Sequence, residues 1–110
     1  MNYTDDQLKS ILAKMLPETI AQHACGKYYW IGSANGFVLD TELLYICSYV
    51  EAGLTVEESH DYLDALARIV DPMFGYRGEL TLGIITATWR ARTRALAEVL
   101  GVSASGAKTP

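Results

Sequence analysis

Two histidines and two cysteines are the residues of this 110-residue chain that most readily do chemistry. Imidazoles and thiolates are the usual ligands of zinc, and a structural zinc site takes them in closely spaced pairs so that two loops wrap the ion. Here His23 and Cys25 form one close pair, whereas Cys47 and His60 stand alone. The spacing therefore predicts no zinc site. Because disulfides are rare in the reducing cytosol, we expect Cys25 and Cys47 to be buried thiols.

A different metal chemistry is indicated by the order of the histidines and aspartates. His23, then His60-Asp61, then Asp64 or Asp71 resembles the ligand order of the all-helical HD phosphohydrolases. In that family such side chains hold a divalent metal that lowers the pKa of a bound water for attack on phosphorus. A substrate pocket of that kind needs additional helices, which 110 residues scarcely provide. Sequence motifs for a nucleophile elbow, a phosphate-binding loop or a dinucleotide-binding site are absent. We therefore expect a protein that is not an enzyme and takes no cofactor, with the metal phosphohydrolase as the alternative.

The acidic residues are concentrated in the middle of the chain. Residues 40–71 carry eight acids against one arginine, a local net charge of −7, while the whole chain carries −4. Glu57, Asp61 and Asp64 share one helix face at spacings of four and three, with Glu58 beside them. Such a row of carboxylates can imitate nucleic-acid phosphates and bind arginine-rich surfaces. These four residues, called the acidic row below, are predicted to bind a protein partner with a basic surface.

The basic residues lie towards the other end of the sequence. Arg90 and Arg94 share a helix face with Glu98, whereas Arg92 points elsewhere, so no continuous basic stripe forms. Direct binding of nucleic acid is therefore not expected. The sequence leaves open whether these arginines pair internally with the acidic row or leave it displayed.

A second candidate contact surface lies in the stretch GKYYWIGSANGFVLDTE, residues 26–42. Aromatic and β-branched residues around Asn35-Gly36 predict a short β-hairpin over residues 27–39. With a four-residue loop, the face of Trp30 and Tyr28, with Leu39 opposite, would cover the helical core. The other face would be an apolar contact surface for a second copy or a foreign partner; its residues are Tyr29, Ile31 and Val38.

Helix-start signals divide the remaining sequence into about four helices. Thr4 with Gln7, and Thr55 with Glu58, form capping boxes, and Asp40 is the expected cap of the second helix. Apolar residues at helical spacing follow each cap. The buried stripe of the second helix is predicted to be Leu43, Ile46, Cys47 and Val50, and that of the third helix Tyr62, Leu63, Leu66, Ile69 and Val70. The second and third helices are joined by a few residues around Gly53 and should pack antiparallel.

The fold predicted from these signals is mainly α, a single small bundle-like domain over residues 1–101 with a short β-hairpin near residues 27–39. The segment PETIAQHA after the first helix is expected to add a turn or two of helix, and residues 82–100 to form one long helix, although residues 80–86 would also tolerate a strand. The small, polar residues 102–110 are predicted to be a disordered tail.

The compartment is predicted from what the sequence lacks. No run approaches the roughly 18 apolar residues of a membrane span, and the start, MNYTDDQLKS, is acidic where a signal peptide would be basic. We therefore expect a protein that stays in the cytosol and does not bind membranes.

Two segments, LDTELLYICSYVEAGLTVEESHDY and TATWRARTRALAEVLG, resemble parts of the small uncharacterised proteins from early regions of tailed bacteriophages and prophages. The shared features are a short acidic chain, a helical hairpin opened by Asp-Thr-Glu, and a closing helix rich in Trp and Arg. The resemblance implies a location in the cytosol of a bacterial host. It also implies an accessory role on host or phage machinery, including inhibition of defence nucleases such as CRISPR complexes, or a structural, oligomeric phage subunit. It carries over no functional residue.

Overall fold

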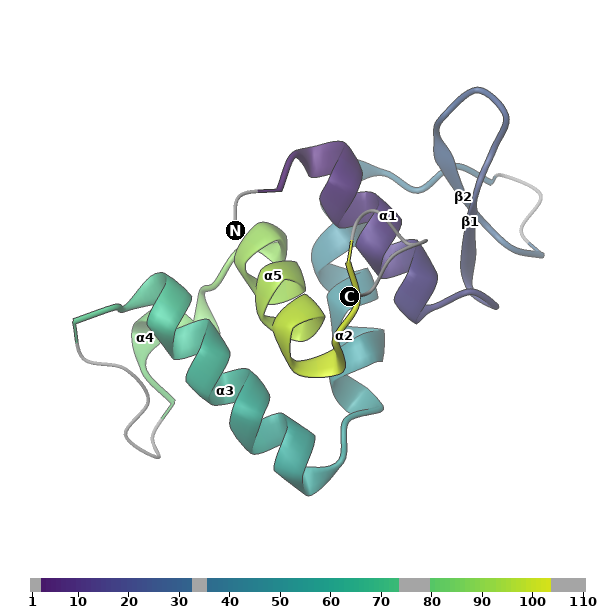
Figure 1. Cartoon of the computed structure of the whole chain (residues 1–110). Helices are drawn as coiled ribbons and strands as arrows, with labels where there is room; N and C mark the ends of the chain where they lie inside the picture. The colour runs from purple at the N-terminus through teal and green to yellow at the C-terminus, as the bar shows by residue number, and fades with distance from the viewer. Residues whose placement is uncertain (1–2, 33–35, 74–79, 104–110) are drawn as a thin grey trace.

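The computed structural model describes residues 3–32, 36–73 and 80–103. Its elements in chain order are α1 (Asp5–Met15), β1 (Ile20–Gln22), β2 (Tyr28–Trp30), the 3-10 turn η1 (Asp40–Glu42), α2 (Leu43–Ala52), α3 (Val56–Val70), α4 (Leu82–Ile85) and α5 (Trp89–Leu100) (Figure 1). The predicted mainly α fold with one small antiparallel hairpin is confirmed.

Helix α5 lies at the centre of the fold. It packs against α1, α2 and α3. Helices α2 and α3 lie on opposite sides of it (Figure 1). The predicted direct packing of α2 against α3 is therefore wrong. Close approach from several directions is possible because most residues that α5 buries are small; they are Ala91, Thr93, Ala95 and Ala97, together with Leu96.

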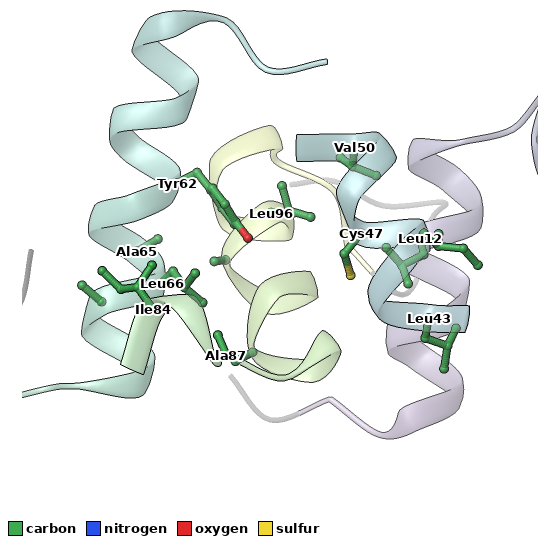
Figure 2. Packing of buried hydrophobic residues seen from close by; sticks show 14 of the residues in the cluster. Leu12, Leu43, Cys47, Val50, Tyr62, Ala65, Leu66, Ile84, Ala87 and Leu96 are labelled. Atoms are coloured by element: carbon green, nitrogen blue, oxygen red, sulfur yellow. The ribbon is translucent and has the colours of Figure 1, made fainter. Parts of the chain in front are cut away.

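The core is built by apolar residues that enter from both sides of α5. Figure 2 shows Tyr62 and Leu66 of α3 on one side and Cys47 and Val50 of α2 on the other. The stripe predicted for α2 is confirmed in full, with Leu43, Ile46, Cys47 and Val50 all buried. In α3 the stripe is wrong at Ile69, which is exposed, because α3 turns the alanines at 65 and 67 towards its neighbours.

The helix ends follow the predicted caps with one exception. The capping boxes of Thr4 with Gln7 and of Thr55 with Glu58 are both formed. Asp40 does not cap α2, because the chain first makes the 3-10 turn η1. The Glu42 carboxylate instead reaches back and accepts a hydrogen bond from the Leu39 backbone N–H at 2.8 Å.

The hairpin uses a first strand that the sequence did not indicate. Strand β1 comes from the segment PETIAQHA, so the helical turns predicted there are wrong. It pairs antiparallel with β2, Ala21 lying opposite Tyr29, through a tight turn in which Gly26 has a φ of 92°. A left-handed backbone of this kind favours glycine. The predicted partner strand, residues 37–39, contributes a single bridge between Tyr29 and Phe37 on the other edge of β2.

The long helix predicted over residues 82–100 is divided into α4 and α5. The Thr86 hydroxyl donates to the Leu82 carbonyl at the end of α4, and the Thr88 hydroxyl accepts from the Ala91 N–H at the start of α5. Threonine competes in this way with the backbone pairing of a continuous helix. The front of the segment is thus helical rather than a strand.

The end of the described chain remains packed beyond Gly101. Val102 lies against the small cluster of Leu8, Ile11 and Ala97, and the Lys14 ammonium donates to the Ser103 carbonyl at 2.8 Å. The expected disorder therefore does not extend to residues 102 and 103, while the domain boundary at residue 101 stays a prediction. The rest of the predicted tail, residues 104–110, lies outside the described residues.

Candidate protein-binding surfaces

Arg90 pairs with the first helix and not with the acidic row. Its guanidinium donates two parallel hydrogen bonds to Asp5, with Nε and Nη2 each 2.8 Å from a carboxylate oxygen. Its hydrogen bonds hold the pKa of Asp5 below the usual range and raise the pKa of Arg90 itself. This bidentate pair joins α5 to α1.

The Arg92 side chain is largely buried and forms hydrogen bonds within the fold. Its Nη1 lies 2.8 Å from Glu51, and its other nitrogens donate to the carbonyls of Ala87 at 3.0 Å and Ile85 at 2.9 Å. The Tyr62 hydroxyl donates to the same Glu51 oxygen. Burial, followed by the hydrogen bond and charge of Glu51, raises the pKa of Tyr62. This network of Glu51, Tyr62 and Arg92 connects α2, α3 and α5, and its arginine satisfies carbonyls at the end of α4.

The acidic row is consequently left mostly displayed. Glu57 and Asp61 are exposed, and neither forms an ion pair within the described part of the chain. Asp64 lies 3.4 Å from Arg68, which also pairs with Glu98 at 3.1 Å. Glu58 is half-buried and closes the capping box of Thr55. Of the four predicted residues, Glu57 and Asp61 therefore form the open part of the row.

The hairpin presents a different face from the predicted one. Val38 was expected on the outer face, yet it is half-buried and packs against the core together with Trp30. Leu39, expected to face the core, is exposed. The bridge between Tyr29 and Phe37 differs from the predicted register by three residues, and an odd shift moves every side chain of a strand to the opposite face.

An aromatic cluster occupies the outer face that the register creates. The ring of His23 makes edge-on contacts with Tyr29 at 6.2 Å and with Phe37 at 5.9 Å. The Lys27 ammonium lies 5.6 Å from the centre of the Phe37 ring, and Ile31 is exposed near the end of β2. Tyr29 and Ile31 thus lie at the predicted surface, while His23 and Phe37 belong to it without having been predicted. Only the correct register could have identified them.

The residues of the phosphohydrolase alternative are not brought together. His23 lies in the hairpin and His60-Asp61 on α3, and Figure 1 places these elements at opposite ends of the molecule. Within residues 3–32, 36–73 and 80–103, no three His, Cys, Asp or Glu side chains are close enough to hold a metal ion.

A pocket of about 360 Å³ separates the hairpin from α1. Leu12, Ile20 and Leu43 are its apolar lining, and the ion pair of Lys9 with Asp40, at 3.3 Å, lies on its edge. Side chains distant in sequence form it, which is why sequence reasoning missed it.

Helix α2 exposes a surface that sequence reasoning also missed. Leu44, Tyr45 and Tyr49 are 48%, 58% and 44% exposed on the side away from the core. The two tyrosine rings meet edge-on at 5.0 Å, and the Tyr49 hydroxyl donates to that of Tyr45 at 2.9 Å. The available signal was the segment LLYICSYV, which is apolar on all sides although only one side of a peripheral helix can be buried.

Comparison with known proteins does not place the chain. No family model, no curated protein and no solved structure matches it. None of the helices in the described ranges has the length and apolar character needed to cross a membrane. Function is therefore inferred from the surfaces of this molecule.

Proposed function

We propose that this protein is a non-enzymatic accessory protein that binds a basic surface on a bacterial host or phage protein through the acidic row. One observation carries the proposal. Arg90 and Arg92 pair with Asp5 and Glu51, so that Glu57 and Asp61 remain exposed without a cationic partner in the described chain.

The chemistry of the row suits such a partner. Carboxylates one helical turn apart repel each other and cost the helix a few tenths of a kcal/mol. A partner with arginines at matching spacing removes that repulsion and gains charge-assisted hydrogen bonds. Because the groups are exposed, their main effect is on the rate of association at low salt.

The acidic row and the hairpin serve separate contacts in this proposal. Figure 1 places α3 and the β1–β2 hairpin at opposite ends of the molecule, so one ordinary partner surface would not cover both. We assign the basic partner to the acidic row because its charges specify the chemistry of what binds. The cluster of His23, Tyr29 and Phe37 carries no comparable specification.

A narrower form of the proposal rests on the resemblance to early phage proteins. A nuclease of a bacterial defence system binds nucleic acid on a basic surface. A row of carboxylates on a rigid helix can occupy that surface in place of phosphates, which would inhibit the nuclease in the bacterial cytosol.

The test is affinity capture from bacterial lysate with three baits: the wild type, the double variant Glu57→Gln with Asp61→Asn, and the control Glu18→Lys. The double variant and the control both change the net charge from −4 to −2, and Glu18 is exposed in the turn before β1. We expect one protein to be retained by the wild type and the control, to be lost with the double variant, and to elute at high salt. Equal recovery with all three baits, or recovery unaffected by salt, would refute the proposal.

A further inference from the structure

The exposed side of α2 is free of charge, which sets it apart in this acidic protein. The side is formed by Leu44, Tyr45, Ser48, Tyr49 and Ala52, all exposed. Three acids, Asp40, Glu42 and Glu51, flank it in sequence, and each has a partner within the protein. Asp40 pairs with Lys9 at 3.3 Å. Glu42 accepts hydrogen bonds from Trp30 Nε1 and the Leu39 N–H, and Glu51 is held by Arg92 and Tyr62.

The polar atoms on this side are also largely satisfied within the helix. The Tyr49 hydroxyl donates to Tyr45, and the Ser48 hydroxyl donates to the Tyr45 carbonyl. The contact between the two rings limits their freedom before anything binds, which reduces the entropy lost on association. Tyrosine held in this way is typical of the centre of protein interfaces.

We infer that this side of α2 binds the same side of a second copy of the chain, forming a two-fold symmetric dimer. Charge selects this occupant. Each copy carries −4, so two copies repel each other wherever their charged surfaces meet. On the exposed side of α2 they can meet without burying a charge or opposing two acids. A basic partner of the kind proposed for the acidic row gains nothing from an uncharged surface.

The two-fold symmetry fixes which residues meet. In an isologous contact between antiparallel helices, each residue faces a residue at an equal distance beyond the axis. An axis passing midway between positions 45 and 49 places Tyr45 of each copy opposite Tyr49 of the other. Ser48 and Ala52 are small and permit close approach of the two helices.

The accessible area predicts a weak, reversible dimer. A fully buried aromatic side chain contributes 150–250 Å², so Tyr45, Tyr49 and Leu44 at their observed exposures offer roughly 300 Å² per copy. The total is below that of standard interfaces, so we expect a weak dimer with a dissociation constant in the micromolar range or above.

Sedimentation velocity of the purified chain between about 1 and 500 µM tests the inference, a range that brackets the expected dissociation constant. We expect the wild type to shift from monomer to dimer. Tyr45→Glu should stay monomeric with an unchanged thermal melt, because it buries an unpaired charge in the contact. The control Val56→Glu changes an exposed apolar residue on α3 to the same acid and should dimerise like the wild type.

A charge-swap experiment tests the pairing itself. Tyr49→Lys should also be monomeric alone, whereas an equal mixture of Tyr45→Glu and Tyr49→Lys should form a mixed dimer, because Glu and Lys then face each other. A wild type that stays monomeric throughout, a Tyr45→Glu variant that still dimerises, or a mixture that fails to associate would each overturn the inference. The measurement needs no partner protein, so it is independent of the outcome for the acidic row.

Discussion

Replacing Arg92 with methionine is expected to lower the free energy of unfolding by about 3 kcal/mol. The guanidinium is only 16% exposed, and the Glu51 carboxylate that it pairs with is 23% exposed. Removing one member of such a pair leaves the other charge poorly solvated, and the change typically costs 3–5 kcal/mol when burial is complete. The carbonyls of Ala87 and Ile85 also lose a donor. Because water reaches part of the site, the lower end of that range is expected.

Arg90→Met is the matched control, since the same residue type lies two positions away on the same helix. Its hydrogen bonds to Asp5 have good geometry, but both side chains are about half exposed. Solvent and salt screen an exposed pair, and a pair of this kind adds little to stability. Arg90→Met should therefore be much less destabilising than Arg92→Met, although it removes the more regular ion pair.

Urea denaturation followed by circular dichroism at 222 nm measures both variants under identical conditions. The double variant Arg92→Met with Glu51→Gln should be less destabilised than the sum of its single variants by about 1 kcal/mol or more, because the uncompensated carboxylate is then gone. If Arg92→Met costs under about 1 kcal/mol, or no more than Arg90→Met, the network does not stabilise the fold as argued.

Two further predictions concern the thiols and a glycine. The prediction of buried thiols is wrong for Cys25, which is exposed, and right for Cys47, which is buried. A thiol reagent should therefore modify one cysteine in the native protein and two after denaturation; rapid modification of both would contradict the packing of α2. Burial raises the pKa of the Cys47 thiol to about 11 from an ordinary value of 9.0. Because the folded state then keeps a proton that the unfolded state loses, stability is full below about pH 9 and falls by up to a few kcal/mol towards pH 11. Cys47→Ala should reduce this slope in pH-dependent denaturation. Gly101 has a φ of 68°, so Gly101→Ala should cost about 1 kcal/mol, whereas Gly53→Ala, at a φ of −89° with only backbone oxygens nearby, should be close to neutral in thermal melts.

The parts of the fold that were predicted correctly depend on local rules. The capping boxes of Thr4 and Thr55 form within a single turn of chain, and the stripe of α2 needs only the helical period. The hairpin could not be predicted in the same way. Tyr28–Trp30 is able to pair on either edge, and the choice of β1 depends on Ile20, which is buried against the helical core. That packing exists only in three dimensions.

The candidate surfaces could likewise be predicted only where local spacing along the chain determines them. Spacing alone placed Glu57 and Asp61 on an exposed helix face, but whether the arginines would pair with them depended on partners far away in sequence. Arg92 meets an acid 41 positions earlier, and Arg90 meets one 85 positions earlier. The central place of α5 was missed for a related reason, because its buried surface consists of alanine and threonine and gives little hydrophobic signal.

The central place of α5 also sets the order in which the molecule can acquire structure as it is made. Helix α5 is the last of the described helices to be synthesised, yet α1, α2 and α3 all pack against it. Until residues 89–100 have left the ribosome, the earlier helices have no common partner to bury their apolar stripes. Short isolated helices are marginal in water, so we expect the earlier helices to gain most of their stability only once α5 is available. Contacts of long sequence separation, such as Asp5 with Arg90, can form only then.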